Sequence, residues 1–237
     1  MFLNININYL ANLRNSIGGS EPDILRCARY CEHSGADGII AHFFEGVVGL
    51  NSYDIKNLKK HLKSRFILKI PTLDEYQNLA LDCRPDIVCI VPFSREISPK
   101  NGFNILKNQT ELAKFVLPIK NNGSKICVFI EPEIDQVNSA YKIGADYVEL
   151  NTTKYVESFK NGNFKDDYIN IKECSILAKT LGLNVMLGSS LNYQNVSTLA
   201  EIHGVTDINV GHSVVTKAIF VGLDSAIKEM KELVNEK

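Results

Sequence analysis

The feature that most constrains this chain is a regular alternation of short apolar runs with longer amphipathic segments. Runs of six or seven residues with strand character lie at 2–7, 38–43, 65–70, 86–92, 125–131, 147–152, 183–188 and 207–212. Helical patterns lie near 22–34, 53–63, 73–82, 105–121, 133–142, 166–181, 195–202 and 213–235. Strands that alternate with helices predict parallel βαβ units, and eight nearly continuous apolar strands favour a closed barrel over an open sheet. We therefore predict an α/β protein, a (β/α)8 TIM barrel in which residues 1–237 form a single domain.

A weak internal repeat supports the barrel. Gly-Ala-Asp stands before the second and sixth predicted strands, at 35–37 and 144–146, and Pro85-Asp86 and Thr206-Asp207 stand before the fourth and eighth. Each even-numbered strand thus follows a turn ending in Asp, as expected for a barrel built from βαβα quarters.

Composition excludes several classes of partner. The net charge is -1 with no basic stripe, which argues against nucleic acid. No apolar run approaches the roughly 20 residues that a membrane span needs, and the first residues lack the pattern of a signal peptide. The six cysteines show neither zinc-ligand nor disulfide spacing, so we expect reduced thiols in a cytoplasmic protein with no metal.

The least regular stretches, 43–52, 93–104 and 152–165, follow strand ends and would overhang the face where barrels build their sites. His42 and His212 each end a predicted strand at that face. A histidine there can exchange protons with a substrate near neutral pH. The alternative for both is a structural hydrogen bond in the rim.

Two turns of small residues predict a phosphate site. Gly188-Ser189-Ser190 ends the seventh strand, and Gly211-His212-Ser213 ends the eighth and leads into the last helix. Loops after these two strands, with a helix N-terminus, commonly bind phosphate in such barrels, because exposed N–H groups and the helix dipole favour an anion.

Lys69 and Glu149 stand near the ends of the third and sixth strands. If both point inward they should pair, because a lone buried charge costs several kcal/mol. Catalysis is the other possibility, and a lysine in this place could form an imine with a carbonyl substrate.

At this point the motifs resemble a known family, the pyridoxine 5'-phosphate synthases of vitamin B6 biosynthesis. The resemblance covers nearly the whole chain and depends on NININYLANLRN (4–15), SGADGIIAH (34–42), VPFSREIS (91–98), GADYVELNT (144–152), LGLNVMLGSSLNYQNV (181–196) and INVGHSVVTKAIFVGLDSAIKEM (208–230). It implies a barrel with extra short helices that assembles as an octamer. It also implies a transferase that joins 1-deoxy-D-xylulose 5-phosphate to 3-amino-2-oxopropyl phosphate without metal or organic cofactor.

The resemblance suggests roles for individual positions. His42, Lys69 and Glu149 stand at catalytic positions, and substrate-binding positions are Asn6, Asn8, Ser98, Ser189, Ser190, Gly211 and His212. Several of these depart from the family. Lys69 replaces a glutamate, Ser189 a histidine and Ser190 a glycine, while Asn8-Tyr9 replaces Asp-His and Ser98 a threonine. Ile17 and Phe44 stand where the family has arginines, and Gly49 where it has a histidine.

These departures remove acid/base groups and phosphate-binding arginines. Loss of one acid or base typically lowers a rate by about 10²–10⁴. We therefore expect an impaired or altered synthase. The alternative is a catalytically silent paralogue that binds a phosphorylated ligand or a protein partner.

Overall fold

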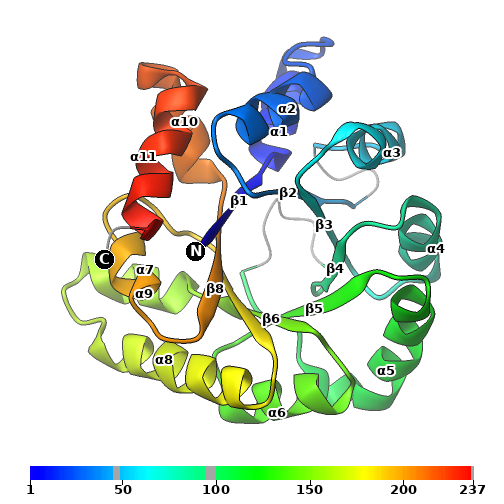
Figure 1. The fold of residues 1–237 in the computed structure, drawn as a ribbon, viewed down its shortest axis with the longest axis vertical. Helices are drawn as coiled ribbons and strands as arrows, with labels where there is room; N and C mark the ends of the chain where they lie inside the picture. The colour runs from blue at the N-terminus through cyan, green and yellow to red at the C-terminus, as the bar shows by residue number, and fades with distance from the viewer. Residues whose placement is uncertain (45–48, 94–99, 236–237) are drawn as a thin grey trace.

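The computed structural model describes residues 1–44, 49–93 and 100–235, and its centre is a closed barrel of parallel strands in chain order (Figure 1). The strands are β1 (Phe2–Asn6), β2 (Gly38–His42), β3 (Arg65–Ile70), β4 (Ile87–Ile90), β5 (Lys125–Ile130), β6 (Tyr147–Asn151), β7 (Asn184–Gly188) and β8 (Val205–Val210). Pairing of β8 with β1 closes the barrel. The predicted α/β class and the (β/α)8 barrel are confirmed.

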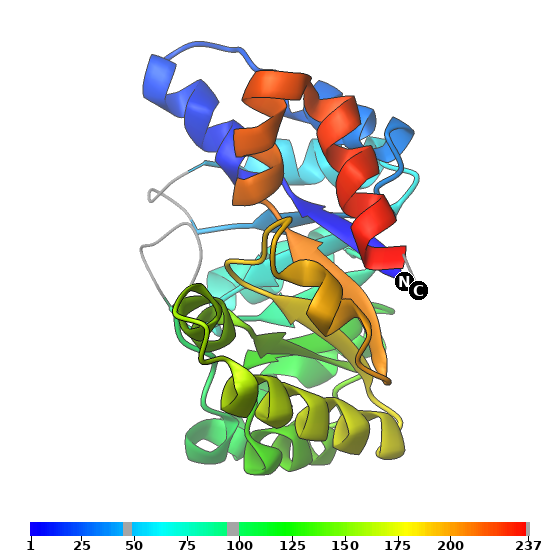
Figure 2. The ribbon, with the colours of Figure 1, turned by 90° about the vertical axis from the view of Figure 1, so that its left-hand side faces the viewer.

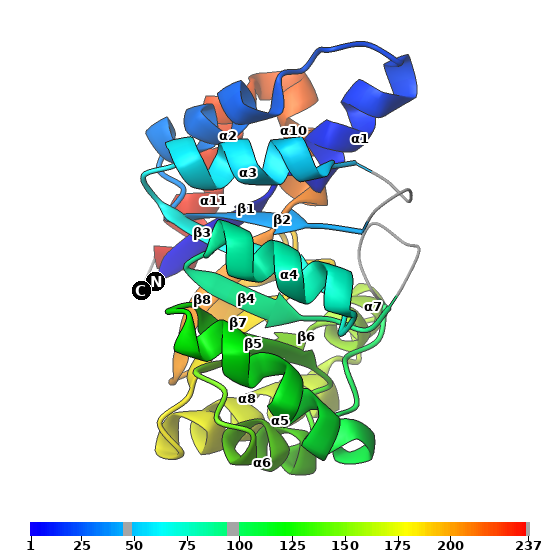
Figure 3. The same ribbon diagram turned by 90° about the vertical axis from the view of Figure 1, so that its right-hand side faces the viewer.

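Helices surround the barrel on all sides (Figures 1 and 3). They are α1 (Asn8–Ile17), α2 (Ile24–His33), α3 (Ser52–His61), α4 (Asp74–Cys83), α5 (Ile105–Asn121), α6 (Ile134–Lys142), α7 (Thr153–Lys160), α8 (Lys165–Thr180), α9 (Val196–Ala200), α10 (His212–Val221) and α11 (Leu223–Asn235). Among these described helices, none combines the length and the apolar character that crossing a membrane would require.

Side-chain alternation along the strands divides the core in two. Ile40, Ile67, Cys127, Phe129 and Met186 belong to a cluster inside the barrel. Their neighbours in sequence pack in a larger cluster between the strands and the helices. Because successive strand residues point to opposite sides, strands buried on both faces need the nearly continuous apolar runs seen in the sequence.

The repeated aspartates have a common structural role. The side chains of Asp37, Asp86 and Asp146 accept hydrogen bonds from the backbone N–H groups of Leu3, Phe66 and Ile126, at 2.6, 2.8 and 2.9 Å. Each therefore ties the start of an even-numbered strand to the odd-numbered strand before it. In the fourth quarter Thr206 takes this place, and its hydroxyl oxygen lies 3.0 Å from the Val185 carbonyl oxygen.

Two helices lie where the sequence predicted none. Residues 8–17 form α1 directly after β1, and α7 occupies part of a stretch expected to be irregular. Both are short, and α1 is rich in asparagine, a weak helix former. Periodicity over a window of 11–18 residues does not separate such helices from loops.

The prediction of a single helix at 213–235 is wrong. Gly222, with φ +81° and ψ 155°, breaks it into α10 and α11, which pack against each other. A glycine adopts this conformation without strain, so it can turn the chain between two helices.

The two ends of the barrel axis differ. Met1 and Asn235 lie together at one end, where the N-terminal ammonium group is 2.7 Å from the Asn235 side-chain oxygen. Helix α7 lies at the opposite end, which is the end toward which the strands run (Figures 2 and 3). This is the end where the sequence placed the site.

Candidate active site

A cavity of about 540 Å³ opens at the carboxyl ends of the strands. Its polar lining includes Asn6, Tyr9, Lys69, Lys100, Glu149, Thr153, Glu157, Lys160, Ser189, Ser190, Asn192, Asn209, His212 and Ser213. The strands, α7 and the first turn of α10 all contribute. Seven of the ten residues predicted to form the site therefore line one cavity, namely Asn6, Lys69, Glu149, Ser189, Ser190, Gly211 and His212.

Lys69 and Glu149 form an ion pair at the base of this cavity. The Lys69 Nζ lies 2.7 Å from Glu149 Oε1 and 2.6 Å from Oε2. Glu149 is 1% exposed and Lys69 9%, so both charges are nearly removed from water. The pairing expected from the sequence is confirmed.

Electrostatics hold the lysine in its charged form. Burial by itself lowers the pKa of Lys69, but the negative charge of Glu149 and its hydrogen bond outweigh that effect and leave the pKa above its ordinary value. At neutral pH the side chain is therefore an ammonium ion that neutralises Glu149.

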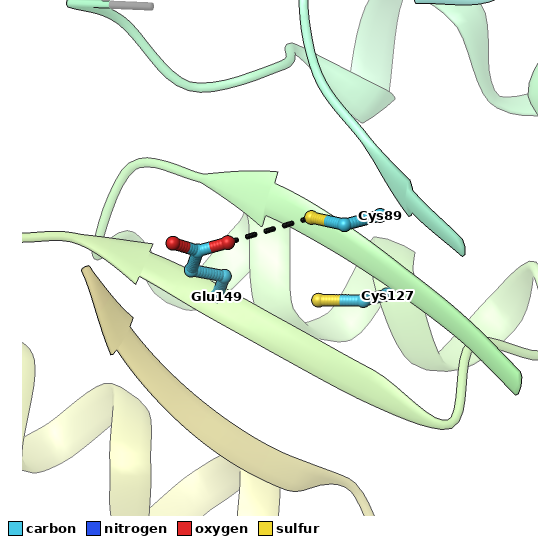
Figure 4. Close-up of side chains that lie close together, drawn as sticks. All are labelled: Cys89, Cys127 and Glu149. Atoms are coloured by element: carbon cyan, nitrogen blue, oxygen red, sulfur yellow. Dashed lines mark hydrogen bonds between the residues drawn. The ribbon is translucent and has the colours of Figure 1, made fainter. Parts of the chain in front are cut away.

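Two thiols lie beside the carboxylate (Figure 4). Cys89 donates to Glu149 Oε2 at 3.4 Å, and the ligand atoms of Cys89, Cys127 and Glu149 all lie within 4.8 Å of one another. Burial and a hydrogen bond to Cys89 raise the pKa of the Cys127 thiol well above its usual range. A cation would have to displace the Lys69 ammonium and deprotonate the thiols, so this arrangement favours the ion pair over a metal.

The turn after β7 has a strained backbone. Ser189 and Ser190 have φ values of +87° and +63°, which residues other than glycine rarely adopt. The Thr152 hydroxyl donates to the Ser189 carbonyl at 2.5 Å, and the Thr153 and Ser189 hydroxyls lie 2.9 Å apart. Backbone strain of this kind is retained where the surroundings enforce it, which occurs frequently at ligand sites.

The turn after β8 begins α10. Gly211 is the residue before the helix and His212 is its first residue. A Cβ atom at Gly211 would lie 2.9 Å from the Asn6 Cβ and from the Tyr9 ring, so only glycine fits between these side chains. The Ser213 hydroxyl donates to the Leu191 carbonyl at 2.9 Å and joins the two turns. The first turn of α10 therefore lines the cavity together with the serines, and the N–H groups at a helix start have no partner within the helix, which favours an anion there.

Asn8 and His42 are connected to each other. The Asn8 side chain accepts from the His42 backbone N–H at 2.7 Å and donates to the His42 carbonyl at 2.5 Å. Both residues are buried, and neither is among the described lining of the cavity, where β2 contributes Ile40. His42 follows Ile40 by two residues and so points to the same interior side of the barrel. Its catalytic role, like the substrate contact of Asn8, stays a prediction.

Ser98 lies outside the described residues. The sequence missed Tyr9, Thr153, Lys160 and Asn209, which also line the cavity. Asn209 could have been found, because it stands two residues before Gly211 on the same face of β8. Thr153 and Lys160 depend on α7, whose two turns gave no periodic signal.

A closed parallel barrel with a polar cavity at the carboxyl ends of its strands has the architecture of the (β/α)8-barrel enzymes. Solved structures agree on the fold. A thiamine phosphate pyrophosphorylase from Pyrococcus furiosus matches with a TM-score of 0.64 at 16% identity, over 99% of this chain and 95% of that one. A phosphoribosylanthranilate isomerase from Thermotoga maritima matches with a TM-score of 0.62 at 12% identity, over 100% of both chains.

Sequence relatives define the family. The chain belongs to the family described as pyridoxal phosphate biosynthesis protein PdxJ, whose model matches residues 3–236. It is 34% identical to a pyridoxine 5'-phosphate synthase of Chlorobium phaeobacteroides, over 99% of this chain and 100% of the relative. A synthase of the same name from Geobacter sp. strain M21 is 36% identical, over 98% of each chain. The resemblance stated from the sequence motifs is confirmed.

Proposed function

We propose that the chain is a pyridoxine 5'-phosphate synthase-type transferase with impaired or altered activity. In this reaction 1-deoxy-D-xylulose 5-phosphate and 3-amino-2-oxopropyl phosphate are joined, with release of phosphate and water. The observation that carries the proposal is the single cavity that contains the Lys69–Glu149 pair and the two turns after β7 and β8. The family membership supports the substrate class.

The acid/base chemistry of the site is reduced. Ring closure needs several proton transfers, and a lysine held as an ammonium ion by Glu149 cannot act as a resting carboxylate base. Ser189 does not titrate near neutral pH. The family implies acid/base groups at positions 42, 69 and 189, and of these only His42 is the same residue type in this chain. His212, which lines the cavity, is the histidine that could substitute for a lost group.

The test is formation of pyridoxine 5'-phosphate by purified protein from the two substrates. We expect a rate at least about 10²-fold below that of a typical relative, as loss of one acid or base predicts. His42→Ala should abolish the remaining activity, and Lys69→Glu combined with Ser189→His should raise it. A rate typical of the family would overturn the proposed impairment. Binding of both substrates without any product would identify a silent paralogue.

Phosphate binding can be tested separately by calorimetry with each substrate. Gly211→Ala should weaken binding, because the added Cβ pushes Asn6 and Tyr9 out of place. Gly19→Ala is the matched control, since the nearest atom to its Cβ would be 3.9 Å away. Binding that both variants leave unchanged would place the phosphate elsewhere.

We also propose a homo-oligomer, an octamer by the family resemblance. Ile219 and Phe220 on α10 are 76% and 83% exposed, and Ile17 on α1 is 70% exposed. Exposed apolar residues on neighbouring helices commonly mark an interface. Light scattering should show an assembly that Phe220→Glu dissociates, and a monomeric parent protein would overturn the proposal.

The cellular site is proposed to be the cytoplasm. All six cysteines are free thiols, which fits a reducing compartment. Fractionation of cells that express the full chain would test this placement.

A further inference from the structure

Lys69 is the buried amine of the cavity. Two other lysines in its described lining, Lys100 and Lys160, are exposed. Exposed lysines are able to attract a phosphate group as mobile charges, and a buried lysine adds little to that function. We therefore look for a role of Lys69 other than attracting the phosphate group.

The contacts of the Lys69 Nζ in the described part of the chain include a carboxylate and an aromatic ring. Glu149 contacts it through both oxygens, and the centre of the Phe129 ring lies 5.3 Å away. The thiols of Cys89 and Cys127 lie beside the Glu149 carboxylate (Figure 4). The ammonium form of Lys69 is the resting state, so imine formation requires its proton to pass to Glu149, the acceptor that it already contacts.

That proton transfer would leave a neutral amine facing the cavity. A neutral lysine amine is a nucleophile toward carbonyl carbon, whereas an ammonium ion is not. Glu149, once protonated, lies within hydrogen-bond distance of the same nitrogen and can return the proton. The pair thus contains both the nucleophile and its general acid/base.

We propose that Lys69 forms a covalent imine with the carbonyl group of a phosphorylated ketone or aldehyde. This inference rests on the proposed function to the extent that the same cavity binds phosphorylated carbonyl compounds. The two turns after β7 and β8 line that cavity together with Lys69, so a small molecule can reach both with its two ends.

The steps balance within the site. Glu149 takes a proton from the ammonium group, and the amine nitrogen attacks the carbonyl carbon to form a carbinolamine. Glu149 then donates a proton to the hydroxyl group, which leaves as water while the carbon–nitrogen double bond forms. Hydrolysis by the reverse path restores the lysine, so no oxidant, reductant or metal takes part.

The experiment is reductive trapping on the intact protein with dihydroxyacetone phosphate and sodium cyanoborohydride, followed by mass spectrometry. A reduced imine adds the mass of the ketone minus one oxygen atom. We expect one such adduct per chain, located on Lys69 by peptide mapping. Lys69→Arg, which keeps the positive charge, should abolish it, whereas Lys114→Arg, on the exposed side of α5 and outside the cavity lining, should not. Trapping should also rise with pH, since it requires the neutral amine.

Two further ligands define the carbonyl and phosphate requirements. Glycerol 3-phosphate should compete with dihydroxyacetone phosphate for the cavity, but it should form no adduct because it has no carbonyl group. Dihydroxyacetone without phosphate should be trapped at least about tenfold less, because it lacks the charge-assisted hydrogen bonds that a phosphate group makes.

The outcomes separate this inference from the proposed function. An adduct on Lys69 without pyridoxine 5'-phosphate formation would support the imine and reject the synthase. Synthase activity without an adduct on Lys69 would overturn the imine, as would an adduct spread over surface lysines or one that persists in Lys69→Arg.

Discussion

The barrel interior holds two ion pairs that begin on the same strand and differ in their surroundings. Four residues apart on β3, Arg65 pairs with Asp207 at 2.6 Å and Lys69 pairs with Glu149 at 2.6 Å. We call them the floor pair and the mouth pair. Asp207 and Glu149 are each 1% exposed, so burial of the carboxylate does not distinguish them.

The difference lies in the other partners. In the floor pair, Asp207 also accepts from Asn4 at 3.1 Å and from Thr206 at 2.7 Å, while Arg65 donates to Asn4 at 3.0 Å and lies over the Phe2 ring. In the mouth pair, Glu149 has the Cys89 thiol besides Lys69, and both charges line the cavity. The hydrogen-bond network makes the floor pair a structural element. The mouth pair has few other partners and borders a cavity, so it can change partners when a ligand binds.

Removing the cation is expected to have the largest effect. Lys69→Met should destabilise the fold by about 3–5 kcal/mol, because Glu149 would be left buried with a thiol as its main donor. Arg65→Met should cost less, about 1–3 kcal/mol, since Asp207 keeps two hydrogen bonds. Urea unfolding measures both, with Lys160→Met as an exposed control expected within about 0.5 kcal/mol of the parent. Equal costs for the two pairs would break the comparison.

The glycines beside the two pairs offer a second test. A Cβ at Gly188 would lie 2.1 Å from Glu149 Oε1, and a Cβ at Gly38 would lie 2.3 Å from Asn4 Oδ1 and 3.2 Å from the Arg65 carbonyl oxygen. Overpacking of this kind costs about 1–3 kcal/mol. Gly38→Ala should be the costlier change in thermal unfolding, because backbone yields less than a side chain, while Gly188→Ala should be the one that lowers ligand affinity. A reversed order would show that the mouth is the more rigid region.

Alkaline pH should separate the pairs by titration. The folded pKa of Lys69 lies above its ordinary 10.5, so the stability from the mouth pair is complete below about pH 10.5 and is lost as pH rises through the folded pKa. One group changes the unfolding free energy by at most about 1.4 kcal/mol per pH unit. Unfolding measured from pH 9 to 11.5 should therefore fall less steeply in Lys69→Met than in the parent. Arg65→Met should keep the parent slope, and a matching loss of slope in that variant would contradict the assignment.

The smallest effect is expected at the strained turn that borders the mouth. Ser190→Gly relieves a positive φ but adds freedom to the unfolded chain, so we expect a change in stability within about 1 kcal/mol. Ligand affinity measured on the same variant should stay close to that of the parent if backbone N–H groups bind the phosphate. A large loss would assign the contact to the Ser190 hydroxyl instead.

The elements that the sequence predicted well are those with strong local signals. The strand pattern located all eight strands within one or two residues, and three aspartates of the sequence repeat make equivalent hydrogen bonds in three quarters of the barrel. Short helices such as α7 were missed because their length leaves no periodicity to detect. Because α7 was not predicted, the sequence could not assign Lys160 to the cavity.

The same contrast holds for the site. The position of Lys69 and Glu149 near strand ends, and the small residues after β7 and β8, could be taken from the sequence alone, because strand order and alternation determine them. Only the tertiary structure decided that the side chains of Lys69 and Glu149 both point inward, that Asn8 contacts the His42 backbone, and that the thiols of β4 and β5 lie beside the carboxylate. Such contacts join residues 22 to 80 positions apart, and they depend on barrel closure, strand stagger and side-chain rotamers, which no local pattern encodes.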